Sequence, residues 1–256
     1  SKTTSPMLTG IKLVLTDIGL TLTGSKADIS SESFSPVTDE EAELSVVSTG
    51  AIVLQARFFS EIVKRLPEKT LSFEVKDNFQ TELCSGAAAF TIKGQDANNY
   101  PRLPEIETDD QLMLDVPVLR QLIAQTVIAV STQESRPILT GVHLVLAGGE
   151  LLAVATDSHR LAQRKINLDI NPNIRYDVII PGKSLVELSR TLGEDFDQVE
   201  MRVADNQVLF LAGNTAFYSR LLEGNYPETS RLIPTTSSTK AEFNAPSLLA
   251  AIERAS

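Results

Sequence analysis

Two short segments of the sequence carry residue types that could do chemistry. The first is Gly182-Lys183-Ser184, which lies between an expected strand and an expected helix, as the end of a phosphate-binding loop does. The complete motif needs a glycine five residues before Gly182, and Asp177 stands there instead. We therefore expect no nucleotide site at this segment.

The second segment, Asp157-Ser158-His159, contains the three residue types of a hydrolase triad. Side chains of sequence neighbours diverge, so these three cannot align as nucleophile, base and orienting acid. The chain has only two histidines and one cysteine, too few for a His/Cys metal cluster. We expect a protein that is not an enzyme, with no catalytic residue, metal or cofactor. An enzyme that works through Lys183 or Ser158 is the competing hypothesis, which loss of turnover on replacing either by alanine would support.

Composition sets the broad class of the protein. The 256 residues are 42% hydrophobic and 22% charged, which is ordinary for a globular protein. No run approaches the roughly 18 apolar residues of a membrane span, and Ser1–Pro6 has no signal-peptide core. The single cysteine, Cys84, fits a reducing compartment, so we expect a cytoplasmic protein without a membrane partner. The net charge of −10 repels polyanions, so any nucleic-acid role needs a locally basic surface.

An internal repeat is the strongest pattern in the chain. The segment Pro6–Leu15 returns 131 residues later as Pro137–Leu146, with Pro-x-Leu-Thr-Gly in both copies. Tyr100-Pro101 returns in the same order as Tyr226-Pro227. Between these landmarks, Val53–Ala56 and a helical pattern correspond to Val178–Pro181 and another helical pattern. The order of the matches predicts a duplicated domain with changes in loop length.

A third copy begins near the end of the chain, where Phe243–Leu248 resembles Leu114–Leu119. We expect three units: residues 1–107, which lack the first strand and helix of the repeat, residues 108–236, which are complete, and residues 237–256, which begin a truncated third. The chain then corresponds to a window from a three-unit protein.

Apolar periodicity predicts the elements that hold the polar motifs. In the second unit, helices are expected at 117–130 and 182–192, and strands at 111–114, 142–146, 151–155, 177–180, 198–203, 207–212 and 216–222. In the first unit a helix is expected at 56–66, with Phe58, Phe59, Ile62, Val63 and Leu66 facing inward. The fold class is therefore α+β, with repeated domains that each pack two helices on antiparallel sheets.

The segment Thr156–Ala162, followed by Glu223–Pro227 and combined with the Pro-x-Leu-Thr-Gly repeat, resembles the β subunit of bacterial DNA polymerase III, the DNA sliding clamp family. The resemblance implies domains that form a crescent, and two full-length chains that pair head to tail as a homodimer ring. Double-stranded DNA passes through the ring, whose inner side carries the helices. Such a processivity factor tethers the DNA polymerase III catalytic subunit, the clamp loader and other clients, which bind through short linear motifs.

The resemblance also assigns residues to two surfaces. A groove for partner peptides would use Leu139, Thr156, Ser158, His159, Arg160, Leu161 and Pro234. Cations on the polar faces of the helices, and on two loops by resemblance, would face DNA: Lys2, Arg57, Lys64, Arg120, Arg136, Lys183 and Arg190. The resemblance also implies a ring interface between the first and third units, which we place at an edge strand around Glu82–Ile92.

A repeat-built, peptide-binding adaptor without a DNA role is the alternative function. Under that hypothesis the basic residues are merely solvated, as most surface Lys and Arg are. It predicts that charge reversal of Arg120, Lys183 and Arg190 leaves DNA retention unchanged.

Overall fold

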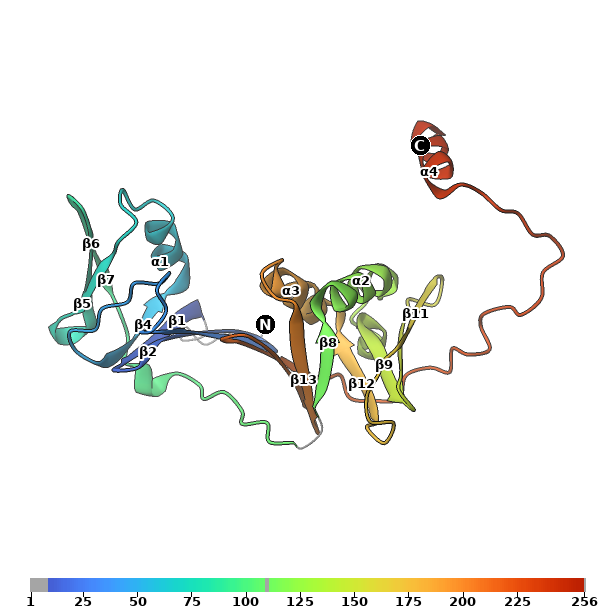
Figure 1. Cartoon of the computed structure of the whole chain (residues 1–256), viewed down its shortest axis with the longest axis horizontal. Helices are drawn as coiled ribbons and strands as arrows, with labels where there is room; N and C mark the ends of the chain where they lie inside the picture. Colours follow the sequence, from blue (N-terminus) through green and yellow to red (C-terminus); the bar gives the residue numbers. More distant parts are fainter. Residues whose placement is uncertain (1–8, 109–110, 256) are drawn as a thin grey trace. The chain divides into compact units, whose positions relative to one another are not determined.

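The computed structural model describes residues 9–108 and 111–255 (Figure 1). Within these residues, no helix has the length and apolarity that crossing a membrane requires. The chain divides into two compact units, one up to Asn225 and one from Tyr226 onward. The larger unit holds the first copy of the repeat and the second copy up to Asn225.

The first repeat is mostly β-structure around one short helix. Its elements are β1 (Gly10–Thr16), β2 (Gly19–Lys26), β3 (Ile29–Pro36), β4 (Gly50–Gln55), α1 (Ala56–Val63), β5 (Ser72–Val75), η2 (Asp77–Phe79), β6 (Gln80–Ser85), β7 (Ala88–Lys93) and η3 (Ala97–Asn99).

The second repeat contains two long helices. Its elements are β8 (Leu112–Asp115), α2 (Val116–Thr126), η4 (Val127–Ala129), η5 (Pro137–Thr140), β9 (Gly141–Ala147), β10 (Glu150–Thr156), β11 (Leu161–Asn167), β12 (Tyr176–Pro181), α3 (Gly182–Leu192), β13 (Gln198–Ala204), β14 (Gln207–Ala212) and β15 (Thr215–Arg220). Every expected element is present, with small shifts at the ends. The strand β11 was missed, because its sequence LAQRKIN is mostly polar and belongs to an edge strand.

The two repeats share one strand register. In the first, Gly10 of β1 pairs with Gln55 of β4, the residue before α1. In the second, Gly141 of β9 pairs with Pro181 of β12, the residue before α3. Equal registers at both sites explain why the Pro-x-Leu-Thr-Gly motif recurs, since its glycine marks the same point in both sheets.

The main hydrophobic core lies in the second repeat. Leu119 and Leu122 of α2 pack with Leu185 and Leu188 of α3, and all four are buried among side chains of the surrounding strands. The helical spacing of these leucines places them on one face, as the sequence predicts. The first repeat has a smaller core around Leu13, Ile52 and Leu54.

The expected inward face of α1 is partly wrong. Phe58 is 56% exposed and Val63 is 41% exposed, and α1 has no buried residue. The helix packs on β1 and β4, whereas α3 packs on α2 as well as on its sheet. An apolar stripe becomes fully buried only when neighbours cover all of it, and α1 has cover along one side.

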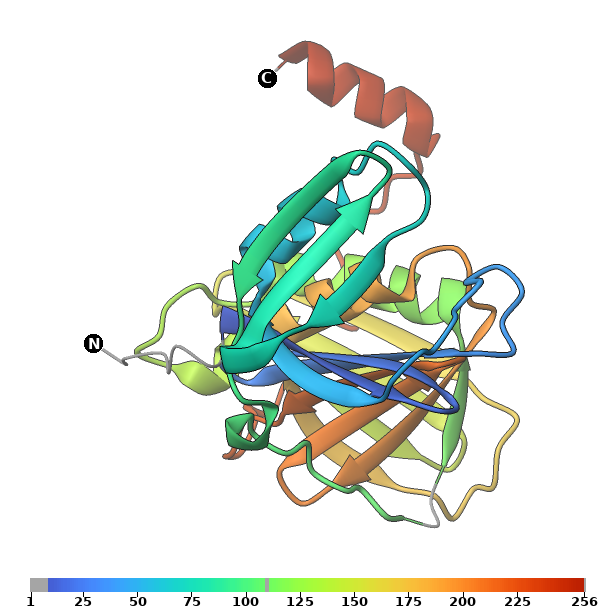
Figure 2. The ribbon, with the colours of Figure 1, turned by 90° about the vertical axis from the view of Figure 1, so that its left-hand side faces the viewer.

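Three sheets hold the larger unit together. The largest joins the repeats in the order β4-β1-β2-β3-β15-β14-β13-β8, with β3 antiparallel to β15. A second sheet has the order β11-β10-β9-β12, and a third has the order β5-β6-β7 and lies in front of α1 in Figure 2. Of the expected edge strand around Glu82–Ile92, only the part in β7 lies at an edge, because β6 is central.

The smaller unit contains one helix, α4 (Ala245–Ala255), which has no buried residue. Asn244 begins this helix, because its side-chain oxygen accepts hydrogen bonds from the N–H (3.1 Å) and hydroxyl (2.9 Å) of Ser247. Pro246 follows at the second helical position, as Pro117 does in α2. The proline position of the α2 start is thus repeated, although Asp115 makes no side-chain hydrogen bond that caps α2.

Burial predicts different responses to shortening an apolar side chain in the two repeats. We expect Leu122→Ala, at 1% exposure, to lower the free energy of unfolding by about 2–5 kcal/mol, because it leaves a cavity. Phe58→Ala should cost less than about 1 kcal/mol, because the ring is largely in solvent. Urea titrations followed by circular dichroism measure both values. Equal losses would contradict the exposed position of Phe58.

Candidate functional site

A tight hairpin turn joins β10 to β11. The last strand pair is Thr156 with Leu161, and the N–H of Asp157 donates to the carbonyl of Arg160 (3.3 Å). Ser158 has a φ of 78°, a left-handed conformation that few non-glycine residues adopt. The corresponding turn of the first repeat holds Ala27 at a φ of 52°. Both hairpins therefore reverse direction in the same way.

Side chains of the turn satisfy its backbone groups. The hydroxyl of Thr156 donates to the carbonyl of Arg160 (2.7 Å) and accepts from the N–H of Ser158 (3.1 Å). One carboxylate oxygen of Asp157 accepts from the N–H groups of His159 and Arg160, both at 2.9 Å. The other oxygen lies 3.0 Å from Nε of Arg160. The turn is thus ordered by its own residues.

The carboxylate of Asp157 organises this turn in its charged form. Hydrogen bonds from the backbone N–H groups of Arg160 and His159 hold the pKa of Asp157 below its usual range. Because the carboxylate binds the backbone N–H of His159 and not its ring, it does not orient an imidazole as a triad requires. The Asp157-Ser158-His159 segment is a structural turn.

The segment before β9 contacts the same turn. Arg136 is exposed, and its Nη1 donates to the hydroxyl of Ser158 at 3.5 Å. Leu139 follows in η5, where it is buried and its carbonyl accepts from the N–H of Ser131 (2.8 Å). Of the expected groove residues, Thr156, Ser158, His159, Arg160 and Leu161 lie together in this hairpin. Pro234 belongs to the smaller unit and is exposed.

Four of the expected DNA-facing residues are exposed at helices. Arg57 is in α1 and Lys64 immediately follows it, and Lys183 and Arg190 are in α3. Arg190 lies 2.8 Å from the carboxylate of Glu187, one turn earlier on the same helix. Lys2 lies outside the described residues.

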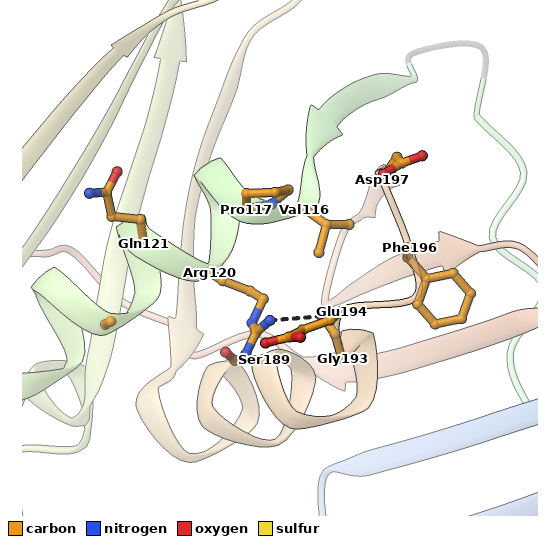
Figure 3. A pocket seen from close by; sticks show the side chains of 10 residues that line it. Val116, Pro117, Arg120, Gln121, Ser189, Gly193, Glu194, Phe196 and Asp197 are labelled. Carbon is orange, nitrogen blue, oxygen red and sulfur yellow. Dashed lines mark hydrogen bonds between the residues drawn. The ribbon is translucent and has the colours of Figure 1, made fainter.

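Arg120 differs from the other helix cations. It is half-buried, and its Nη1 donates to the carbonyl of Gly193 at 2.8 Å (Figure 3). Gly193 has a φ of 50° and follows α3, so this bond satisfies a carbonyl at the helix end. A depression of about 550 Å³ surrounds the pair, lined by α2, α3 and the residues after Gly193. The sequence carried no signal for this bond, which joins residues 73 positions apart.

The Gly182-Lys183-Ser184 segment forms the first turn of α3. A Cβ on Gly182 would lie 3.1 Å from the carbonyl oxygen of Thr140 and from Cγ2 of Val130. Ser184 is buried and Lys183 is exposed. The glycine therefore allows the helix start to approach η5 and Val130 closely, and the residues form no open phosphate loop.

The organising role of Asp157 was missed from the sequence. One signal could have found it: the 131-residue offset aligns Ala27-Asp28 with Ser158-His159, and hence two hairpin turns. A carboxylate immediately before a tight turn commonly caps the N–H groups that follow it.

Two family models match the chain. The N-terminal domain of the DNA polymerase III beta subunit matches residues 1–104, and its central domain matches residues 113–228. A beta sliding clamp of Bacillus subtilis is 51% identical over 257 residues, covering 100% of this chain and 68% of the relative. A beta sliding clamp of Streptococcus pneumoniae is 46% identical over 256 residues, again with 100% and 68% coverage.

Solved structures agree. The crystal structure of the DNA polymerase sliding clamp from Bacillus subtilis matches with a TM-score of 0.95 and 51% identity, covering 100% of this chain and 67% of that chain. The chain therefore spans about two thirds of the length of these relatives. With both family models matched and this identity along its whole length, the chain belongs to the family of DNA polymerase III beta subunits, the beta sliding clamps.

Proposed function

We propose that this chain acts in the cytoplasm as part of a ring-shaped sliding clamp that encircles double-stranded DNA. It catalyses no reaction of its own, and as a processivity factor it tethers the DNA polymerase III catalytic subunit, the clamp loader and other clients. The observation that carries the proposal is the seam between β3 and β15, which joins two units of equal register edge to edge. In full length, two chains pair as a homodimer.

The domain organisation follows from the repeat. We assign residues 1–107 to the first clamp domain, 108–236 to the second and 237–256 to the start of the third. The family matches at 1–104 and 113–228 support the first two assignments. The helix α4 supports the third, because its Asn244 start corresponds to the Asp115 start of α2.

The same strand pairing would join a third unit to the second. β11 occupies in the second repeat the place that β3 occupies in the first, and β11 is the edge strand of its sheet. The edge of β3 is filled by β15 of the next unit. By the same rule, β11 would pair with the corresponding strand of a third unit, so that successive units continue one sheet edge after another.

Basic residues suit a clamp that slides. A sliding ring must bind the phosphate backbone and read no bases, a task for mobile cations at exposed positions. Arg57, Lys64 and Lys183 fit this role. Arg190 is also exposed but is paired with Glu187 on the same helix, and Lys2 and Arg136 join them by resemblance. We assign Arg120 a smaller share, because its guanidinium is held by the Gly193 carbonyl. The net charge of −10 discourages DNA from binding elsewhere.

The hairpin turn would form one wall of the client groove. Thr156, Ser158, His159 and Arg160 present polar groups, and the partly exposed Leu161 supplies apolar surface beside them. The buried Leu139 and Pro234 of the smaller unit are assigned to the groove by resemblance alone. Because the turn is ordered by internal hydrogen bonds, a client peptide need not order it on binding, which favours affinity. Short linear motifs bind sites of this kind through backbone contacts and one or two apolar anchors.

Topological linkage tests the ring. We expect the full-length protein, loaded by a clamp loader onto nicked circular DNA, to stay bound in high salt. It should leave the DNA after one cut linearises the circle. Phosphate contacts alone weaken by roughly 0.9 log units per contact for each log unit of salt. Gel filtration before and after cutting measures the retained protein. Equal loss from both DNA forms would refute encirclement.

Charge reversal tests the helix cations. We expect Arg57→Glu with Lys183→Glu to lower DNA affinity at low salt and to reduce the salt slope by about one for each lost contact. Lys69→Glu with Arg175→Glu, which changes two exposed cations assigned to neither DNA nor an interface, is the control with the same change of charge. Fluorescence polarisation with labelled duplex DNA at several salt concentrations measures both quantities. An unchanged slope in the double variant would favour the adaptor function.

The charge of Asp157 predicts a pH dependence of client binding. Its folded pKa is lowered, so the stabilisation of the turn is present above the ordinary Asp pKa of about 4 and is lost as pH falls through the lowered value. We expect Asp157→Asn to weaken binding of a labelled client-motif peptide about three- to tenfold at pH 7. The affinity of the variant for the peptide should also lack the decrease at acidic pH that protonation of Asp157 causes in the unchanged chain. Asp169→Asn removes an equal, exposed charge and serves as the control, so equal weakening in both variants would contradict the role of Asp157.

A further inference from the structure

A second hollow lies where the linker between the repeats crosses the seam. After η3 the described part of the linker, up to residue 108, runs as an extended green segment (Figure 1). Between Leu103 and Glu107 it borders a depression of about 400 Å³ over strands β3, β13, β14 and β15. This place is distinct from the hairpin turn at Thr156–Leu161, and it contains residues from both repeats.

The floor of the hollow is apolar. Val208 and Phe210 of β14 point into the main core, so the alternating Leu209 and Leu211 point to the opposite face of the sheet. Leu209 is nevertheless only 4% exposed, and Ile106 in the linker is 7% exposed. Tyr218 of β15 lies directly across from Leu209 in the strand register.

The rim of the hollow is acidic. Glu32, Glu105 and Glu107 line it, and Arg202 is the cation among its lining residues. Arg202 is already paired with the carboxylate of Glu200, so its charge is neutralised locally. Burial, and then the nearby Glu32, raise the pKa of Tyr218, which keeps its phenol neutral. The uncompensated carboxylates therefore favour a cationic ligand.

The linker also presents backbone groups. Residues 103–107 take part in none of the backbone–backbone hydrogen bonds between described residues. An extended segment with N–H and C=O groups open to solvent can pair with another extended chain, while side-chain pockets give specificity. Carboxylates and an aromatic ring beside an apolar floor suit arginine or lysine next to a large apolar side chain.

We propose that this hollow is a second docking site, which binds an extended peptide carrying arginine or lysine beside a large apolar residue. The apolar side chain packs on the partly exposed Leu103 and Leu211, above the buried Leu209 and Ile106. The cation lies among Glu32, Glu105 and Glu107, close to the ring of Tyr218. The site goes beyond the proposed function, because it needs neither the client groove nor DNA.

Fluorescence polarisation with the 256-residue chain tests the site. The probe is a fluorescein-labelled octapeptide of alternating arginine and leucine, compared with peptides in which glutamate replaces arginine or serine replaces leucine. We expect saturable binding of the arginine–leucine peptide alone. The double variant Glu105→Lys with Glu107→Lys should bind about tenfold more weakly, because two exposed attractions become repulsions.

The control variant carries the same change of charge elsewhere. Glu40→Lys with Glu41→Lys alters the exposed loop between β3 and β4 and should bind within about twofold of the unchanged chain. Asp157→Asn should also keep its affinity, which separates this site from the client groove.

Four results would overturn the proposal. They are equal weakening in both charge variants, equal binding of the arginine–serine peptide, and no saturation below about 1 mM, the weak end of specific binding. The fourth is concentration-dependent sedimentation that the linker variant abolishes, which would assign the hollow to a second copy of the chain.

Discussion

Backbone hydrogen bonding between β3 and β15 is the constraint on which the larger unit depends. Each strand would otherwise end its sheet with unpaired N–H and C=O groups, which bind other strands indiscriminately. Pairing across the repeats satisfies those groups and fixes the position of one repeat against the other. It also places Glu32 and Tyr218 near the linker, so the hollow exists only because the seam does.

The two repeats share their strand registers and differ in their helices. Strand registers and the left-handed turn residues Ala27 and Ser158 are retained, while the helices differ. In the second repeat α2 and α3 bury a continuous apolar core, and Arg120 closes the end of α3. Within residues 9–108, the first repeat has α1 as its one α-helix over the sheet, with Phe58 in solvent. The same apolar helix pattern thus gives a buried helix pair in the second repeat and a partly exposed helix in the first.

Local patterns of the sequence predicted most elements, because apolar spacing and turn residues report on nearest neighbours. The repeat added long-range information, since two copies that share a motif must share a fold. The features that the sequence did not predict depend on residues far apart in the chain. The exposure of Phe58 depends on whether another element covers that side of α1. The hydrogen bond from Arg120 to Gly193 joins residues 73 positions apart, which no local sequence pattern contains. β11 was missed because an edge strand keeps a polar composition. The turn residues lie together in one hairpin, and their role as a client groove stays a prediction, whereas the role of Asp157 in ordering the turn needed the geometry.

The seam also bears on how such a chain evolves. Its hydrogen bonds join main-chain atoms, which every residue except proline supplies equally. The side chains of β3 and β15 that face away from the core are therefore not needed to hold the repeats together, whereas Phe217 lies in the main core and Ile29 packs against it. Ser30, Glu32, Ala216 and Tyr218 sit in register across the junction without any shared chemical theme. Substitutions at these positions change which ligands the surface can bind and leave the backbone pairing of the two repeats unchanged.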